Sequence, residues 1–121
     1  MLHFPTTYRQ LIKLGIEEDY SMGYASHPGF RAGTSFPFRF YDLIGEHETR
    51  LVIHPFAVMD VTLQQYLGFS PVEAIKKMKE VKEKVKSVNG NFIILWHNES
   101  LSEYGAWKGW RNVWEEIING E

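Results

Sequence analysis

The chain has 121 residues, a formal net charge of −2 and no cysteine. A chain of this length is expected to fold as one domain around one hydrophobic core. Without cysteine it forms neither disulfides nor thiolate metal sites, and its balanced charge gives no basis for binding a nucleic-acid backbone. We expect no membrane span, because no segment approaches roughly 18 consecutive apolar residues. No targeting signal is visible, so cytoplasm and cell envelope both stay open.

The beginning of the chain predicts one helix and one weak strand. Pro5 suits the first turn of a helix and Gly15 provides a stop, so we expect a helix of about ten residues between them. Residues 16–24 are compatible with a strand, although acidic residues interrupt the pattern. Residues 25–35 contain a proline and two glycines, and they predict a long loop.

A pair of strands is predicted next. Phe36, Phe38 and Phe40 alternate with other residues, as in a strand with one apolar face. Residues 45–49 form a polar turn, after which residues 51–54 restart a strand. We therefore expect a hairpin or a close relative of one, set against the edge of the sheet.

The second half begins with the clearest helix. Ser70 and Glu73 have the spacing of a capping box, and Pro71 occupies the first helical position. We predict a helix from there to about Val88, ended by the Asn-Gly that follows. Lysines interleaved with glutamates form its solvated face. Its buried stripe consists of apolar residues at helical spacing: Ile75, Met78, Val81, Val85 and Val88.

A buried strand and a last helix complete the chain. Residues 92–96 form an apolar run that predicts a buried strand, with His97 at its end. After a polar loop, the last helix carries apolar residues at spacings of three and four between Trp107 and Ile118. We interpret this stripe as core. Trp107 is the member most open to another role, a platform for a ligand, because it is nearest the loop after His97.

His97 is the first candidate functional residue. The alternation of strands and helices predicts an α/β fold. Such folds place their chemistry at the carboxyl ends of parallel strands, because the loops that follow can vary on a rigid scaffold. A histidine at that place is a candidate proton carrier. The alternative is a structural histidine that is bonded to a nearby loop.

Four segments of the chain, taken in order, resemble one known family. They are Asp19-Tyr20-Ser21, Gly29-Phe30-Arg31-Ala32-Gly33-Thr34, Ile53-His54-Pro55-Phe56-Ala57-Val58-Met59-Asp60-Val61-Thr62-Leu63 and Leu95-Trp96-His97-Asn98. The ordered set looks like the C-terminal half of a bacterial polysaccharide deacetylase of carbohydrate esterase family four. The likeness extends over essentially the whole chain. Its specificity lies in the order of the segments, since Leu-x-His alone is a common pattern.

The resemblance implies a fold, a reaction and a cofactor. The fold is a distorted (β/α) barrel, of which residues 1–121 would be the C-terminal part, a single domain with a hairpin insertion. The reaction is hydrolysis of an acetamide or acetyl ester on a cell-surface or envelope glycan, so the expected partner is an acetylated polysaccharide or amino sugar. In the family a divalent metal, usually zinc, is held by an aspartate and two histidines near the start of the domain. A late Leu-x-His histidine protonates the leaving amine, and His97 matches that position.

The other candidate site residues each have a second interpretation. Asp19 is a candidate catalytic residue that would orient or tune His97 or bind a sugar hydroxyl, and otherwise it caps its loop. Arg31, Asp60 and Trp107 are the candidate substrate-binding residues. Arg31 either holds a carboxylate or pins its loop to the barrel rim. Asp60 resembles the family's Met-Asp-x-Thr-Leu segment, and otherwise it is a helix N-cap.

The metal side of the family's site has no counterpart in this sequence. The family's Asp-Asp pair and His-x-x-x-His motif do not occur, and the other histidines are not spaced to rebuild a metal site. We therefore expect a fragment, inactive alone, of a metal-dependent hydrolase. The alternative is a non-catalytic carbohydrate-binding or interaction module derived from the same barrel. A half barrel exposes the apolar edge of its sheet, so we also expect a homodimer or larger assembly.

Overall fold

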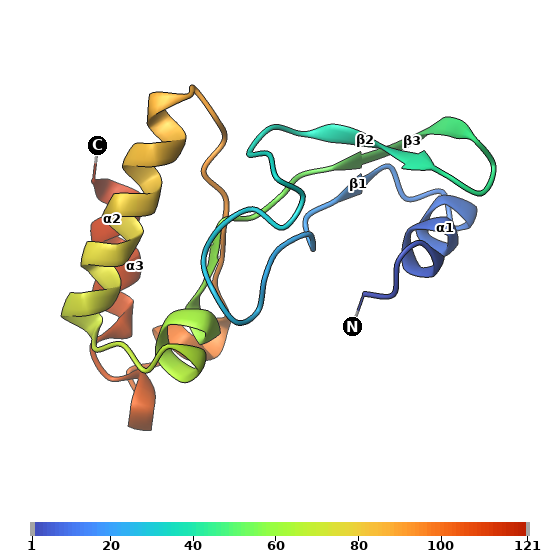
Figure 1. The fold of residues 1–121 in the computed structure, drawn as a ribbon. Coiled ribbons are helices and arrows are strands. Elements are labelled where there is room, and N and C mark those ends of the chain that lie inside the picture. The colour runs from blue at the N-terminus through green and yellow to red at the C-terminus, as the bar shows by residue number, and fades with distance from the viewer. Residues whose placement is uncertain (1, 121) are drawn as a thin grey trace.

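We describe the protein from a computed structural model, which defines residues 2–120 and has mixed α and β structure (Figure 1). Helices and short strands both occur, as predicted, but the first four strands follow one another without a helix between them. In chain order the elements are helix α1 (Thr6–Lys13), strands β1 (Glu18–Asp19), β2 (Phe38–Asp42), β3 (His47–Ile53) and β4 (Val58–Met59), the π-helical turn η1 (Thr62–Tyr66), helix α2 (Pro71–Ser87), strand β5 (Ile94–Leu95), the 3-10 turns η2 (Asn98–Leu101) and η3 (Gly105–Trp107), and helix α3 (Trp110–Asn119).

The first sheet has the strand order β1-β3-β2 and packs against α1. Strands β2 and β3 are antiparallel, which confirms the predicted hairpin. β3 begins at His47, so it includes residues that we expected in the turn. The strand expected over residues 16–24 is wrong in extent, because β1 contains only Glu18–Asp19, parallel to β3. It ends there because the carboxylate of Asp19 binds the N–H and hydroxyl of Ser21, which turns the chain away from the ladder.

The second sheet is the parallel pair β4–β5, and α2 is part of the connection between the two strands. Val58 pairs with Ile94 and Met59 with Leu95. The strand expected over residues 92–96 is therefore shorter than predicted, because the partner strand extends over only two residues. We predicted no strand at β4, since a short apolar run after His54-Pro55 carries no periodicity of its own.

Helix α2 confirms the predicted capping box. The Ser70 hydroxyl accepts the N–H of Glu73 at 3.3 Å, and the Glu73 carboxylate accepts the N–H of Ser70 at 3.1 Å. Two of the predicted stripe residues, Met78 and Val85, are buried. Val88 is 58% exposed, so its assignment to the stripe was wrong. The helix ends at Ser87, and Val88 lies past its last turn.

Helix α3 begins three residues later than the predicted start at Trp107. Trp107 belongs to η3, and Gly109 separates the two elements with a φ of 88°. The side chain of Glu103 accepts the N–H groups of Gly109 and Arg111, which have no helical partner of their own. These contacts define the beginning of the helix at Trp110.

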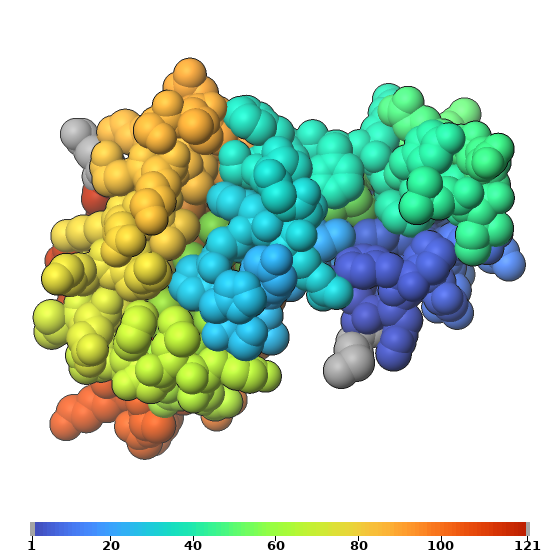
Figure 2. Space-filling view, viewed as in Figure 1, coloured from blue at the N-terminus to red at the C-terminus, as the bar shows by residue number. Residues whose placement is uncertain are grey.

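Residues 2–120 form two hydrophobic clusters where we expected one core. The larger cluster joins β4, α2 and α3, and the smaller one joins α1 with β3. The parts of the chain around these two clusters form two lobes. In Figure 2 the lobes are separated by a narrower region that the loop before β2 fills. The ring of Phe56 lies against the backbone of Gly23, where any Cβ would overlap it. This contact connects the loop to the segment between β3 and β4.

Within residues 2–120 the strands form these two small sheets and no closed barrel. The described residues have a mixed α and β fold, and the predicted class is confirmed at that level. None of the described helices combines the length and apolar character that a bilayer crossing needs.

Candidate functional site

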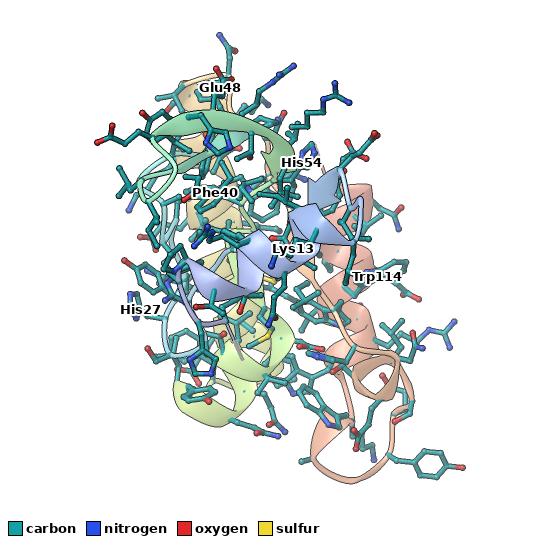
Figure 3. All side chains as sticks on the ribbon, turned by 90° about the vertical axis from the view of Figure 1, so that its right-hand side faces the viewer. Lys13, His27, Phe40, Glu48, His54 and Trp114 are labelled. Carbon is teal, nitrogen blue, oxygen red and sulfur yellow. The ribbon has the colours of Figure 1, made fainter. Side chains whose placement is uncertain are left out.

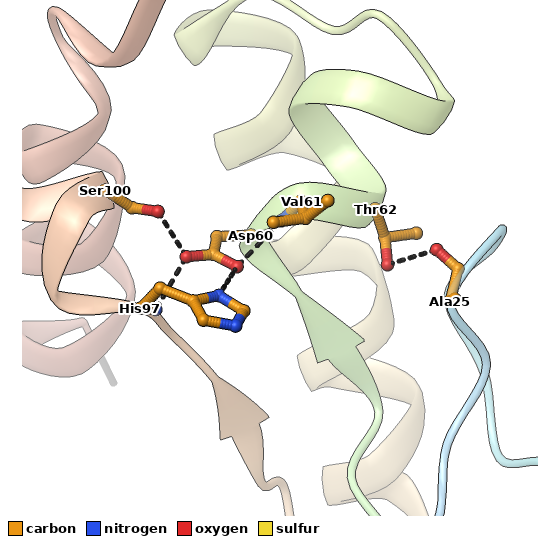
Figure 4. A network of polar contacts seen from close by, with 6 residues as sticks. All are labelled: Ala25, Asp60, Val61, Thr62, His97 and Ser100. Atoms are coloured by element: carbon orange, nitrogen blue, oxygen red, sulfur yellow. Dashed lines mark hydrogen bonds and ion pairs between the residues drawn. The ribbon is translucent and has the colours of Figure 1, made fainter. Parts of the chain in front are cut away.

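Two polar side chains meet where β4 and β5 end. Because the strands are parallel and Met59 pairs with Leu95, the residues that follow both strands emerge at the same edge. Asp60 follows β4 directly, and His97 follows β5 after one residue. Although they are 37 residues apart in sequence, their side chains are in contact (Figure 4).

The carboxylate of Asp60 is surrounded by hydrogen-bond donors. Oδ1 accepts the N–H of Val61 at 2.7 Å and lies 2.7 Å from Nδ1 of His97. Oδ2 accepts the backbone N–H of His97 at 2.7 Å and the hydroxyl of Ser100. The side chain of Asp60 is completely buried. A buried carboxylate is tolerated only when its oxygens are hydrogen-bonded, and here each oxygen has two partners.

These contacts determine which nitrogen of the His97 ring carries a hydrogen. An ionised carboxylate only accepts, so Nδ1 holds the hydrogen and donates it to Asp60. Nε2 lies on the opposite side of the ring and has no hydrogen-bond partner among residues 2–120. The side chain is 51% exposed. A half-exposed imidazole with one fixed nitrogen and one free nitrogen can exchange protons with a bound molecule.

Ser100, His97 and Asp60 have the residue types of a hydrolytic triad but a different geometry. A nucleophilic serine contacts the imidazole, and the aspartate binds the opposite ring nitrogen. Here the Ser100 hydroxyl donates to the aspartate and is completely buried. It is therefore a support for the carboxylate, and the arrangement favours acid–base chemistry by His97 over covalent catalysis by Ser100.

Asp19 lies in the other lobe and is not in contact with His97. Its two carboxylate oxygens bind the hydroxyl of Ser21 at 2.8 Å, and one also accepts the N–H of Ser21 at 3.0 Å. It also faces the buried phenol of Tyr8: burial, and then the charge of Asp19, raise the pKa of Tyr8 well above its ordinary value. The geometry matches the alternative that we gave for Asp19, a residue that caps its loop.

Arg31 lies on the loop before β2, and this loop is attached to both lobes. The guanidinium of Arg31 is 4.7 Å from the centre of the Phe4 ring, a cation–π contact with the segment before α1. The same loop donates the N–H of Gly29 to the carbonyl of Ala57 beside β4. The geometry matches the alternative that we gave for Arg31, a residue that pins the loop.

Trp107 is buried. It is 7% exposed and packs edge to face on Trp110 with ring centres 5.6 Å apart. This is the core role that we preferred for the stripe. Asp60 is the one candidate substrate-binding residue that the structure brings to His97, and it is turned inward, toward the ring and the turn that follows.

The described residues do not fit a metal ion of the kind that the resemblance implies. No group of three or more histidine and acidic side chains in residues 2–120 converges as metal ligands would. The lone pairs of Asp60 are occupied by donors. His54 lies 3.2 Å from a Glu18 oxygen, and His27 is beside Ser26 on the loop before β2. Figure 3 shows His27 and His54 far apart.

Sequence reasoning missed Ser100 and the pairing of Asp60 with His97. The pairing had a signal, because each residue ends a short apolar run, Ala57-Val58-Met59 and Ile94-Leu95-Trp96. Ser100 stands three residues after His97, the spacing that a 3-10 turn brings together, and its N–H binds the carbonyl of His97 at 3.1 Å.

Comparisons with protein-family models, with curated proteins and with solved structures found no match. The function is therefore inferred from the geometry of the site and from the four segments described above.

Proposed function

We propose that this chain is the carboxyl-terminal part of a metal-dependent deacetylase that removes acetyl groups from a polysaccharide or amino sugar. The observation that carries the proposal is the contact between Asp60 and His97 at the ends of two neighbouring parallel strands. Both residues belong to the segments that resemble carbohydrate esterase family four.

In this proposal His97 is the acid for the leaving group. When an acetamide is hydrolysed, water supplies the new oxygen of acetate, and the departing nitrogen must gain a proton as its bond to carbon breaks. The protonated ring gives that proton from Nε2, while Nδ1 keeps its hydrogen bond to Asp60. Of the two protons that the water loses, one restores the protonated ring by way of the solvent and the other stays in the solvent, so the products are acetate and a free amine. Because Asp60 is buried and held by donors on both oxygens, the ring keeps one orientation throughout.

The specific architecture that we propose is the later part of a distorted (β/α) barrel. The order β4-α2-β5 is the repeating unit of such a barrel. Parallel strands are ordinarily covered on both faces within a larger sheet. The pair β4–β5 is two-stranded, and Leu95 at its end is 38% exposed, which is consistent with further strands beside it in the complete barrel.

The metal of the proposed enzyme, usually zinc in the resembled family, needs ligands from outside the described residues. Those ligands would come from a separate segment or subunit, and we assign the metal no step here. What residues 2–120 contribute is the acid side of the site.

The test compares two histidine variants in the complete protein that contains this chain. His97→Gln should lower kcat for acetate release by roughly 10²- to 10⁴-fold, the range for loss of a general acid. His54→Gln is the matched control, because His54 also follows a strand and contacts a carboxylate but has no role in the proposed reaction. Normal turnover per folded molecule for His97→Gln would refute the proposal.

A second measurement separates the enzyme from a binding module. The isolated chain, supplied with zinc and an acetylated chito-oligosaccharide, should release no acetate above background, because residues 2–120 offer no group of ligands that would hold a metal and activate water. If the complete protein binds the oligosaccharide in calorimetry but never releases acetate, the carbohydrate-binding alternative replaces the deacetylase.

A further inference from the structure

Ser100 is a buried hydroxyl in a turn that immediately follows His97. It lies on η2 (Asn98–Leu101), is completely buried, and donates its hydroxyl to Oδ2 of Asp60. Its own N–H binds the carbonyl of His97. The turn from His97 to Ser100 therefore encloses the carboxylate with two donors to one oxygen.

The orientation of the Asp60 carboxylate depends on those two donors. Rotation about the last bond of an aspartate has a broad energy profile, so contacts decide where each oxygen points. Oδ1 faces the His97 ring while the N–H of Val61 holds Oδ1 and the His97 N–H and Ser100 hold Oδ2 (Figure 4). Without the Ser100 hydroxyl, Oδ2 keeps a single donor, and the carboxylate is held less firmly by the three donors that remain.

From this geometry we infer that Ser100 is a positioning residue for His97 that acts through Asp60. By fixing the carboxylate, Ser100 keeps Oδ1 at hydrogen-bond distance from Nδ1, which in turn keeps the hydrogen on Nδ1 and leaves Nε2 free. Ser100 itself touches no substrate. The inference rests on the proposed function only for its effect on turnover, because the position of the hydrogen on the His97 ring can be observed in the chain alone.

The primary experiment reads the hydrogen position on the ring directly. NMR spectra of the chain with isotope-labelled histidine distinguish a hydrogen on Nδ1 from one on Nε2. In the wild type at a pH where the ring is neutral, His97 should carry it on Nδ1. Ser100→Ala should shift His97 toward a mixture of the two forms and leave His54 unchanged. Ser102→Ala is the matched control, since Ser102 lies exposed in the same loop and binds only the N–H of Tyr104.

Several outcomes decide the inference. An unchanged His97 spectrum in a folded Ser100→Ala chain overturns it. If that variant does not fold, Ser100→Cys fills the position with a slightly larger side chain that donates weakly, and it should give the same shift. If neither folds, the wild type decides: the Ser100 hydroxyl proton should give a slowly exchanging signal close to Asp60, and its absence overturns the inference.

Turnover separates this inference from the proposed function. In the complete protein, Ser100→Ala should lower kcat by about 10- to 100-fold with little change in KM, the range for misplacing a catalytic group. If His97→Gln abolishes turnover while Ser100→Ala changes neither turnover nor the hydrogen position on the His97 ring, the proposed deacetylase function is supported and the positioning role of Ser100 is refuted. If Ser100→Ala changes the hydrogen position on the His97 ring but the complete protein never releases acetate, the positioning role of Ser100 is supported and the deacetylase function is refuted.

Discussion

Replacing Asp60 should cost the protein a large part of its stability. In Asp60→Ala, the N–H of His97 and the hydroxyl of Ser100 lose their acceptor at a buried position. Each unsatisfied buried donor costs about 1–3 kcal/mol, so we expect a loss of about 3–5 kcal/mol in the free energy of unfolding. The ring of His97 is half exposed, so water can replace its bond, and the N–H of Val61 keeps a part-buried position. Small domains have only about 5–15 kcal/mol in total.

Asp60→Asn should cost less, about 2–3 kcal/mol, because one oxygen remains and the Ser100 hydroxyl can turn to accept from the new amide. The matched control is Asp42→Asn, another buried aspartate. Asp42 makes a single 3.1 Å bond to the N–H of Ile44 and a 3.5 Å ion pair with the half-exposed Arg9. Its loss should be about 1 kcal/mol.

The assay is urea unfolding at neutral pH followed by tryptophan fluorescence. The four tryptophans of the chain all lie between residues 96 and 114, so their signal reports the lobe that contains the site. A shift in the midpoint without a change in slope gives the stability difference. A loss below about 1 kcal/mol for Asp60→Ala would refute the idea that the carboxylate satisfies buried donors.

Three further predictions concern the rest of the molecule. The pKa of Tyr8 is raised in the fold, so the folded state holds the phenolic proton more tightly than the unfolded state. The free energy of unfolding should therefore fall as the pH rises above about 10. Tyr8→Phe should reduce that loss in urea titrations at alkaline pH and change stability at pH 7 by less than about 1 kcal/mol, because the hydroxyl has no hydrogen-bond partner among the described residues. Gly23→Ala should lower the melting temperature and cost about 1–3 kcal/mol, since the new Cβ overlaps the Phe56 ring; an unchanged melting curve would show that the ring moves freely. Light scattering should detect a dimer or larger assembly at micromolar concentration, in line with exposed apolar residues such as Leu43 at 78%, and a clean single-chain mass would contradict it.

The elements that sequence predicted best are those whose signals are local. The capping box of α2 depends on Ser70, Pro71 and Glu73 alone, so it could be read without knowing the rest of the fold. The hairpin β2–β3 likewise follows from alternation and a turn. The strands β4 and β5 are different, because two residues have no period and only their mutual pairing defines them.

The site was predicted only in part for the same reason. His97 could be identified as a strand-end histidine, but its partner is decided by which strand lies beside β5. We assigned the orienting role to Asp19, whereas Asp60 is the aspartate in contact with the ring. The sequence places Ser100 in the polar loop of residues 98–102, and its burial follows from the packing of η2 against α3. Such long-range contacts leave little trace in a single sequence.

The division into two hydrophobic clusters bears on how the molecule opens. We expect each cluster to open as a cooperative unit of its own, so native-state hydrogen exchange should report two opening free energies in place of one. The amides of β3 would follow the unit that contains Tyr8, and those of α2 the unit that contains the site. A ligand that binds at His97 would then slow exchange in α2 and α3 while leaving β3 almost unchanged. The pattern of protection would locate an unknown ligand on one lobe before its identity is known.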